Sequence, residues 1–109
     1  MEKEIKVWLS DIKQAISEIN QFLPEKKLFA DFQKDLKSRR AIERNIEIIG
    51  EAMGRILKLK PDFPITTARK IIDTRNRIIH GYDEVDFDFL WSVVRNDLPS
   101  LIKQLNKAL

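Results

Sequence analysis

The sequence predicts an all-α protein, a single domain over residues 1–109 with four main helices. Three observations support this prediction. Apolar residues recur at spacings of three and four along most of the chain, which is the pattern of amphipathic helices. No segment alternates apolar and polar residues with the period of two that marks a half-buried strand. A length of 109 residues suits one domain with one modest core.

The first predicted helix is a long amphipathic segment that ends before Pro24. Leu28, Phe29 and Phe32 then form a short apolar connection. A second helix is predicted from about Asp35 to Leu59. The apolar stripe of the first helix contains Ile5, Trp8, Leu9, Ile12, Ile16, Ile19 and Leu23, and that of the second contains Ile42, Ile46, Ile49, Met53, Ile56 and Leu57.

The second half of the chain predicts two more helices, separated from the first two by a proline-rich loop at 60–64. Thr66 or Thr67 can cap the third helix, which carries Ile71, Ile72, Ile78 and Ile79 and stops at Gly81. Asp86 is the expected N-cap of the last helix, and Pro99 within that helix predicts a kink. The apolar residues of the last helix are Phe89, Leu90, Val93, Val94, Leu98, Leu101, Ile102 and Leu105.

Composition narrows the classes of function. A net charge of +3 and a pI near 9.3 permit a polyanion such as RNA as a partner without requiring one. The absence of cysteine excludes thiol catalysis, disulfides and cysteine-ligated metal, and a single histidine argues against a zinc site, so we expect no metal and no cofactor. No apolar run reaches membrane-spanning length and the N-terminus does not resemble a signal peptide, so a cytoplasmic protein without membrane contact is expected.

Two glycines, Gly50 and Gly54, lie inside the second predicted helix and share one face of it. Each costs about 1 kcal/mol relative to alanine in a helix interior. Close approach of another helix, in the same protomer or across a dimer, would offset that cost. Two glycines tolerated beside an ordinary core are an equally weighted alternative.

The stretch from Arg75 to Tyr82 holds the only histidine and the only tyrosine of the chain. Imidazole changes its charge near neutral pH, and guanidinium binds phosphate oxygens in a bidentate manner. This pairing therefore indicates a site that handles phosphate. Asn76 and His80 share a helix face, whereas Arg75 and His80 lie about 140° apart and could converge only at a groove that wraps the helix end.

RNA can be cut without metal when a base takes the 2′-hydroxyl proton and an acid protonates the leaving 5′-oxygen. His80 could be that base or acid, and Arg75 could stabilise the charge on phosphorus. One imidazole cannot do both at once, which favours a dimer with two copies of His80 beside one cleft, although water or the Tyr82 phenol could substitute. A histidine and an arginine near a helix C-terminus are also ordinary structural residues, and by spacing alone that alternative outweighs the catalytic one.

The segment Arg75-Asn76-Arg77-Ile78-Ile79-His80-Gly81-Tyr82 resembles the Arg-x4-His-x-Tyr signature of HEPN-domain ribonucleases, specifically the HepT-like toxins. The resemblance extends along nearly the whole chain in the same order. Residues 41–52 are similar to the long helix of that family with its Gly-Glu-Ala element, and 29–31 match the segment before it. Residues 96–99, followed by Leu101 and Ile102, resemble its closing helix with a kinking proline.

The resemblance implies an antiparallel HEPN bundle of four to five helices that forms a homodimer, with the motifs of both protomers lining one cleft. It implies a metal-independent endoribonuclease that acts on RNA as the toxin of a toxin–antitoxin pair. Arg75 and His80 would be the catalytic residues, and Asn76 would help shape the site. Tyr82 would be the acceptor of AMP from a cognate minimal nucleotidyltransferase antitoxin, whose added negative charge would repel an RNA phosphate.

Two other functions remain open from the sequence. The chain could be a non-catalytic helical binding module that docks a nucleotidyltransferase and offers Tyr82 to it, or a dimeric scaffold in which the motif only packs. The basic segment at 34–40 is more consistent with a solvated helix face than with an RNA contact. Trp8 and Trp91 lie on apolar stripes and are expected to anchor the core or an interface.

Overall fold

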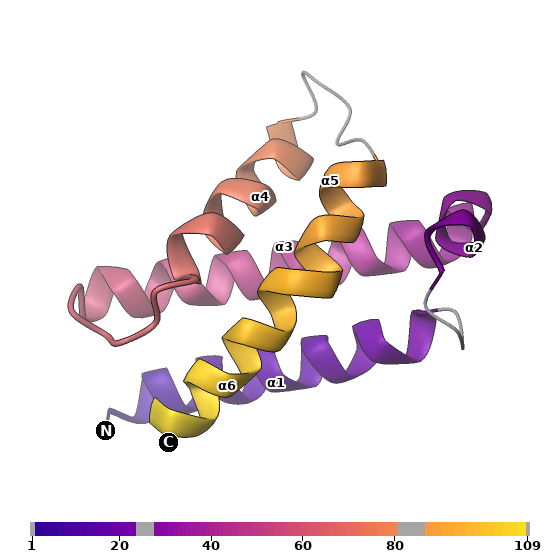
Figure 1. The fold of residues 1–109 in the computed structure, drawn as a ribbon. Coiled ribbons are helices and arrows are strands. Elements are labelled where there is room, and N and C mark those ends of the chain that lie inside the picture. The colour runs from indigo at the N-terminus through magenta and orange to yellow at the C-terminus, as the bar shows by residue number, and fades with distance from the viewer. Residues whose placement is uncertain (1, 24–27, 81–86, 109) are drawn as a thin grey trace.

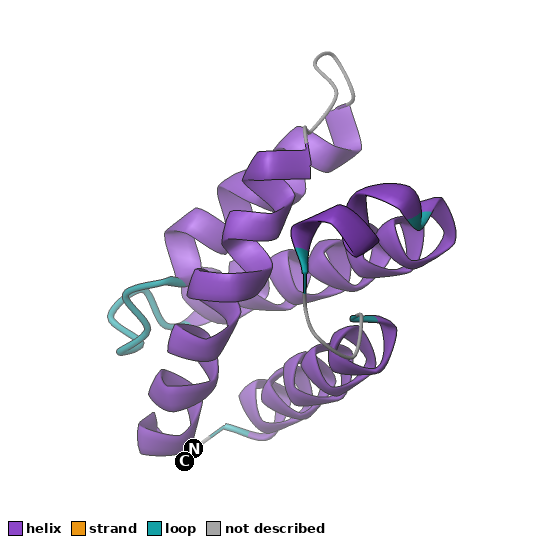
Figure 2. Ribbon diagram, turned by 45° about the vertical axis from the view of Figure 1, so that its right-hand side comes forward, coloured by secondary structure: helices purple, strands orange, loops and turns teal. Residues whose placement is uncertain are grey.

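A computed structural model describes residues 2–23, 28–80 and 87–108 of the protein. All regular structure in these ranges is helical, as Figure 2 shows, so the all-α prediction is confirmed. The elements are α1 (Lys3–Phe22), α2 (Phe29–Lys34), α3 (Leu36–Leu59), α4 (Ala68–His80), α5 (Phe87–Ser92), the π-helical segment η1 (Val93–Asp97) and α6 (Leu98–Ala108).

The long helix α3 is the centre of the bundle. It packs along α1, which runs in the opposite direction, and α4 crosses it on another side (Figure 1). The continuous run of α5, η1 and α6 returns beside α4 toward the N-terminus of α1 (Figure 1). The last turn of α4 and the first turn of α5 therefore lie together at one end of the molecule, and both chain ends lie at the other.

The core follows the predicted apolar stripes. In α1, the stripe residues from Ile5 to Ile19 other than Trp8 are at most 2% exposed. In α3, every stripe residue is fully buried except Leu57, which is half-buried. Trp8 and Leu23 are half-buried at the edges of the α1 stripe. The fully buried members are Ile5, Leu9, Ile12, Ile16, Ile19, Ile42, Ile46, Ile49, Met53 and Ile56.

The segment after α1 differs from its prediction. Residues 29–34 were expected to be an apolar connection, but they form the short helix α2. Phe32 of this helix is completely buried, and its ring centroid lies 6.0 Å from that of Phe87 and 5.4 Å from that of Trp91. A helix of six residues is not stable alone, so these tertiary aromatic contacts are the reason that the helix forms.

The start of α3 agrees with its prediction because Asp35 caps it. The Asp35 carboxylate accepts a hydrogen bond from the backbone N–H of Ser38 at 3.0 Å and another from the Ser38 hydroxyl at 2.6 Å. These two bonds stabilise the charged form and lower the pKa of the Asp35 carboxyl below its ordinary value.

The distortion predicted around Pro99 takes the form of the π-helical segment η1, which ends one residue before Leu98. The N–H of Leu98 donates to the carbonyl oxygen of Val93, a spacing of five residues. Proline has no N–H to donate and its ring crowds the carbonyl one turn earlier, so a widened turn before it relieves that crowding. The expected cap at Asp86 and the stop at Gly81 lie outside the described residues.

Candidate functional site

Arg75 lies where α4 crosses α3, and Gly50 is the residue of α3 beneath it. A Cβ atom added to Gly50 would overlap the Cβ of Arg75 and would lie 2.9 Å from its Cγ and 3.2 Å from the carbonyl oxygen of Ile71. Only glycine therefore allows this approach of the two helices. The close-approach hypothesis is confirmed for Gly50. No such approach occurs at Gly54 within the protomer, where an added Cβ would meet nothing within 4 Å among the described residues, and an approach across a dimer stays a prediction there.

The hydrogen-bond donors of the Arg75 guanidinium are not all paired within the described residues. Its Nη1 donates a hydrogen bond of 2.9 Å to the Asn76 side-chain oxygen, while its Nε is buried and has no hydrogen-bond partner among the described residues. Leaving a buried donor unsatisfied costs about 1–3 kcal/mol. Such a donor calls for an explanation in a native protein, and a water or an anion that reaches it is one.

His80 is the last residue of α4, and its side chain is exposed. Residues 68–80 form one uninterrupted α-helix, so the geometry expected from spacing holds. Asn76 lies one turn before His80 on nearly the same face. Arg75 starts about 140° away around the helix axis. The structure thus joins Arg75 to Asn76, while the exposed His80 starts on a different face of the helix from Arg75. Tyr82 lies outside the described residues.

A second arginine near this end of α4, Arg77, was expected from the sequence to face solvent, with contact to phosphate as the lesser alternative. Its side chain is exposed, and its Cζ lies 3.9 Å from the centroid of the Phe89 ring of α5. The spacing of three residues between Arg77 and His80 could be read from the sequence. The partner ring could not, because Phe89 comes from a different helix.

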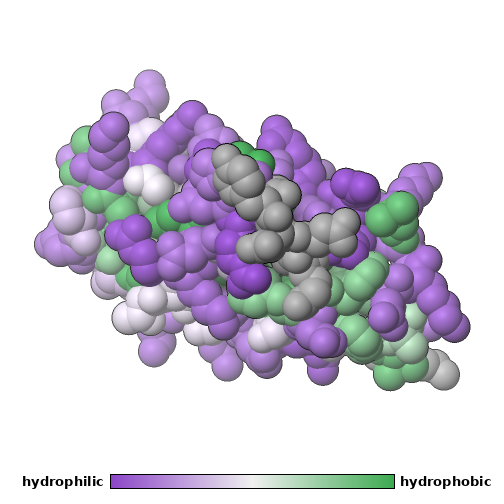
Figure 3. All heavy atoms as spheres, turned by 90° about the horizontal axis from the view of Figure 1, so that it is seen from above, coloured by the Kyte–Doolittle hydropathy of each residue, from purple (hydrophilic) through white to green (hydrophobic). Residues whose placement is uncertain are grey.

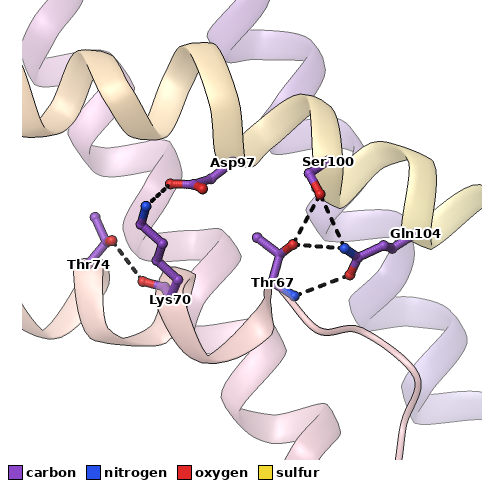
Figure 4. A network of polar contacts seen from close by, with 6 residues as sticks. All are labelled: Thr67, Lys70, Thr74, Asp97, Ser100 and Gln104. Atoms are coloured by element: carbon purple, nitrogen blue, oxygen red, sulfur yellow. Dashed lines mark hydrogen bonds and ion pairs between the residues drawn. The ribbon is translucent and has the colours of Figure 1, made fainter.

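Polar contacts join the other end of α4 to α6 (Figure 4). Thr67 directly precedes α4, and its hydroxyl accepts a bond of 2.9 Å from the Gln104 side-chain amide and lies 3.3 Å from the Ser100 hydroxyl. Lys70 pairs with Asp97 at 3.0 Å. These contacts hold the N-terminal end of α4 against η1 and α6, and so orient the helix that carries Arg75, Asn76 and His80.

The basic segment at 34–40 is partly as predicted. Lys34, Lys37 and Arg40 are exposed. Arg39 is not a solvated charge, because it pairs with Glu43 at 3.2 Å and lies 3.8 Å over the Phe87 ring.

Seen along the end that carries α4 and α5, the surface is mostly hydrophilic, with apolar residues in separate patches (Figure 3).

The described ranges, 2–23, 28–80 and 87–108, also bear on metal binding and on membrane insertion. Within them, no three or more histidine, aspartate and glutamate side chains gather in a way that could hold a metal ion. None of the helices in those ranges is both long enough and apolar enough to span a membrane.

Comparison with known proteins gives a consistent result. Residues 12–108 match the family described as Ribonuclease HepT-like. A protein of Thermococcus cleftensis named "Probable ribonuclease HepT" is 38% identical over 98% of this chain and 97% of its own length. A Methanocaldococcus jannaschii protein with the name "Putative RNase" is 29% identical over 98% of this chain and 88% of its own length. No solved structure gives a significant match.

Proposed function

The chain belongs to the Ribonuclease HepT-like family, and from that premise we propose that it is a metal-independent endoribonuclease, the toxin of a toxin–antitoxin pair. Its substrate is RNA, and the reaction is attack of a 2′-hydroxyl on the adjacent phosphate. The observation that supports this most directly is the placement of Arg75. Its side chain is seated on Gly50, is bonded to Asn76 and keeps a buried Nε donor without a partner.

Arg75 and His80 divide the chemistry between them in this proposal. The Arg75 guanidinium stabilises the negative charge that develops on the phosphorane oxygens, and Asn76 orients that guanidinium through its 2.9 Å bond. His80 moves the proton, either from the attacking 2′-hydroxyl or to the leaving 5′-oxygen. The exposed position of His80 at the end of α4 supports this role.

The proposal also requires two protomers. Arg75 and His80 of one α4 start about 140° apart, and a single imidazole cannot act as base and acid in the same step. A homodimer that brings two α4 ends to one cleft supplies both a second imidazole and a guanidinium on its far side. Sedimentation that shows only monomer at micromolar concentration would contradict this composite cleft.

We further propose that Tyr82, two residues after His80, accepts AMP from a partner nucleotidyltransferase that acts as the antitoxin. An AMP group so close to the cleft would exclude an RNA phosphate by its bulk and its negative charge. Incubation of the protein with such a partner and ATP should add AMP to Tyr82, as detected by mass spectrometry, and should abolish RNA cleavage.

The decisive experiment is cleavage of single-stranded RNA in the presence of EDTA. Wild-type protein should produce fragments with 2′,3′-cyclic phosphate ends, and His80→Ala and Arg75→Ala should each abolish cutting while the helical circular dichroism is retained. Arg69→Ala is the matched control, because Arg69 is an exposed arginine on the same helix. It should cut RNA at the wild-type rate.

Cleavage that persists in both His80→Ala and Arg75→Ala would refute the assignment of these residues. If the wild-type protein cut no RNA but still received AMP on Tyr82, the alternative of a non-catalytic module that docks a nucleotidyltransferase would replace the ribonuclease.

A further inference from the structure

The cation nearest to His80 along α4 is not Arg75. With about 100° per residue, Arg77 starts roughly 60° from His80 around the helix axis, whereas Arg75 starts about 140° away. Residues three apart on a helix are surface neighbours, with Cβ atoms about 5–6 Å apart. Arg75 and Arg77 themselves lie about 160° apart. Helix α4 thus directs one guanidinium toward α3 and another toward α5, with His80 closer to the second.

The side chain of Arg77 is held in place although it is exposed. Its Cζ lies 3.9 Å from the centroid of the Phe89 ring, well inside the range of a cation–π contact. The N–H donors of a guanidinium lie in its own plane. An arginine that rests on a ring loses less conformational freedom on binding an anion than a free side chain does.

Arg39 provides the comparison within the same fold. It also rests on a ring of α5, with its Cζ 3.8 Å from the Phe87 centroid. Arg39 is paired with Glu43, however, and its side chain is only 15% exposed. Arg77 is exposed, and no carboxylate of the described residues forms an ion pair with it. The charge of Arg39 is therefore balanced by Glu43 within the protein, whereas the charge of Arg77 is not balanced by a carboxylate of the described residues.

We propose that Arg77, resting on Phe89, binds an RNA backbone phosphate next to the one that is cut, and so sets the strand against His80. The inference rests on the proposed ribonuclease function and adds a substrate-binding subsite to it. Arg77 takes no proton and does not touch the reacting phosphorus. Its removal should therefore weaken binding of the strand more than it slows the chemical step.

The test measures binding of a fluorescein-labelled single-stranded oligouridylate by anisotropy over a series of KCl concentrations. The protein carries His80→Ala, so that the RNA stays intact. For single strands, each phosphate contact contributes about 0.7 to the slope of log K against log salt. Adding Arg77→Ala should weaken binding and lower that slope by about 0.7. In the cleaving protein, the same change should raise KM more than it lowers kcat.

Two further variants separate a positioned guanidinium from mere positive charge. Arg69→Ala removes an equal charge from an exposed site on the same helix and should leave the slope and KM unchanged. Phe89→Leu keeps the charge of Arg77 but removes the ring beneath it, and should raise KM several-fold. Thermal unfolding of each variant shows whether the fold is intact, and Arg77→Gln replaces Arg77→Ala if the latter does not fold.

The inference is overturned if Arg77→Ala and Arg77→Gln leave the slope and KM at their wild-type values, or if Arg69→Ala lowers the slope and raises KM by as much as Arg77→Ala does. Its failure is distinct from failure of the proposed function. A wild-type protein that cuts RNA with an unimportant Arg77 would refute this subsite alone. A protein that binds RNA through Arg77 but never cuts it would refute the ribonuclease and leave the subsite standing.

Discussion

Two consecutive turns of α3 contain a glycine each and differ completely in what that glycine does. At Gly50, α4 comes so close that a Cβ would overlap Arg75. At Gly54, four residues later on the same side, a Cβ would meet nothing within 4 Å. The comparison shows that α4 lies against α3 at the turn of Gly50 but not at the turn of Gly54. The turn of Gly50 is also the one that seats Arg75, so this close helix contact and the candidate site coincide.

Gly50→Ala should have the largest effect of the substitutions that break this contact. Overpacking of a tight contact costs about 1–3 kcal/mol, and the better helix propensity of alanine returns about 1 kcal/mol. We expect a net loss of up to about 2 kcal/mol in the free energy of unfolding. Because Arg75 must move, kcat for RNA cleavage should fall on the order of 10²-fold with little change in KM. Urea denaturation and cleavage kinetics measure the two effects.

A second substitution tests whether the overlap with Arg75 is the cause. Arg75→Gly removes the two side-chain atoms that a Cβ at position 50 would meet first. In that background, Gly50→Ala should cost less stability than it does beside Arg75, since residues in contact are energetically coupled. An equal cost in both backgrounds would show that the contact with Arg75 is not responsible.

Gly54→Ala is the matched opposite of Gly50→Ala. Space is free at this position, so the substitution should increase the free energy of unfolding by up to about 1 kcal/mol through helix propensity. Cleavage of RNA should be unchanged. A loss of stability or activity here as large as that of Gly50→Ala would remove the distinction between the two turns.

The smallest effect is expected at the start of α3, far along the helix from both glycines. The hydrogen bonds from Ser38 lower the pKa of Asp35 from its ordinary value of 3.8, so they stabilise the folded state fully above that pH. This contribution disappears as the pH falls below 3.8 through the lower folded pKa. Asp35→Ala should therefore be less stable than wild type near neutral pH, and the difference should shrink in acid. Urea denaturation at a series of pH values checks this.

The periodic spacing of apolar residues in the sequence was enough to predict the long helices. The stripes of α1 and α3 follow the period of an α-helix, and the isoleucines on them are buried as expected. Asp35 and Pro99 signal local features, a cap and a distorted turn, that depend on neighbouring residues. Helix α2 was missed because six residues give too short a pattern, and its stability comes from the contacts of Phe32 with Phe87 and Trp91.

For the candidate site too, some features could be predicted from the sequence and others depend on the tertiary structure. Residue type and spacing pointed to Arg75 and His80 and showed that they start on different faces of one helix, whereas the roles of Asn76 and Tyr82 came from the resemblance to the HepT-like family. The bond between Arg75 and Asn76, by contrast, depends on side-chain conformations that no spacing specifies. A phosphate contact of Arg77 was a lesser alternative from the sequence, and its ring partner could not be predicted because Phe89 lies on α5.

The sequence by itself determined the helices, their buried faces and the set of polar residues at the end of α4, because these depend on a local period and on side-chain chemistry. Only the tertiary structure decided which of two equivalent glycines meets another helix, and which arginines rest on a ring or a carboxylate. Those outcomes depend on the angle at which helices distant in sequence cross, and that angle is set by the packing of the whole core.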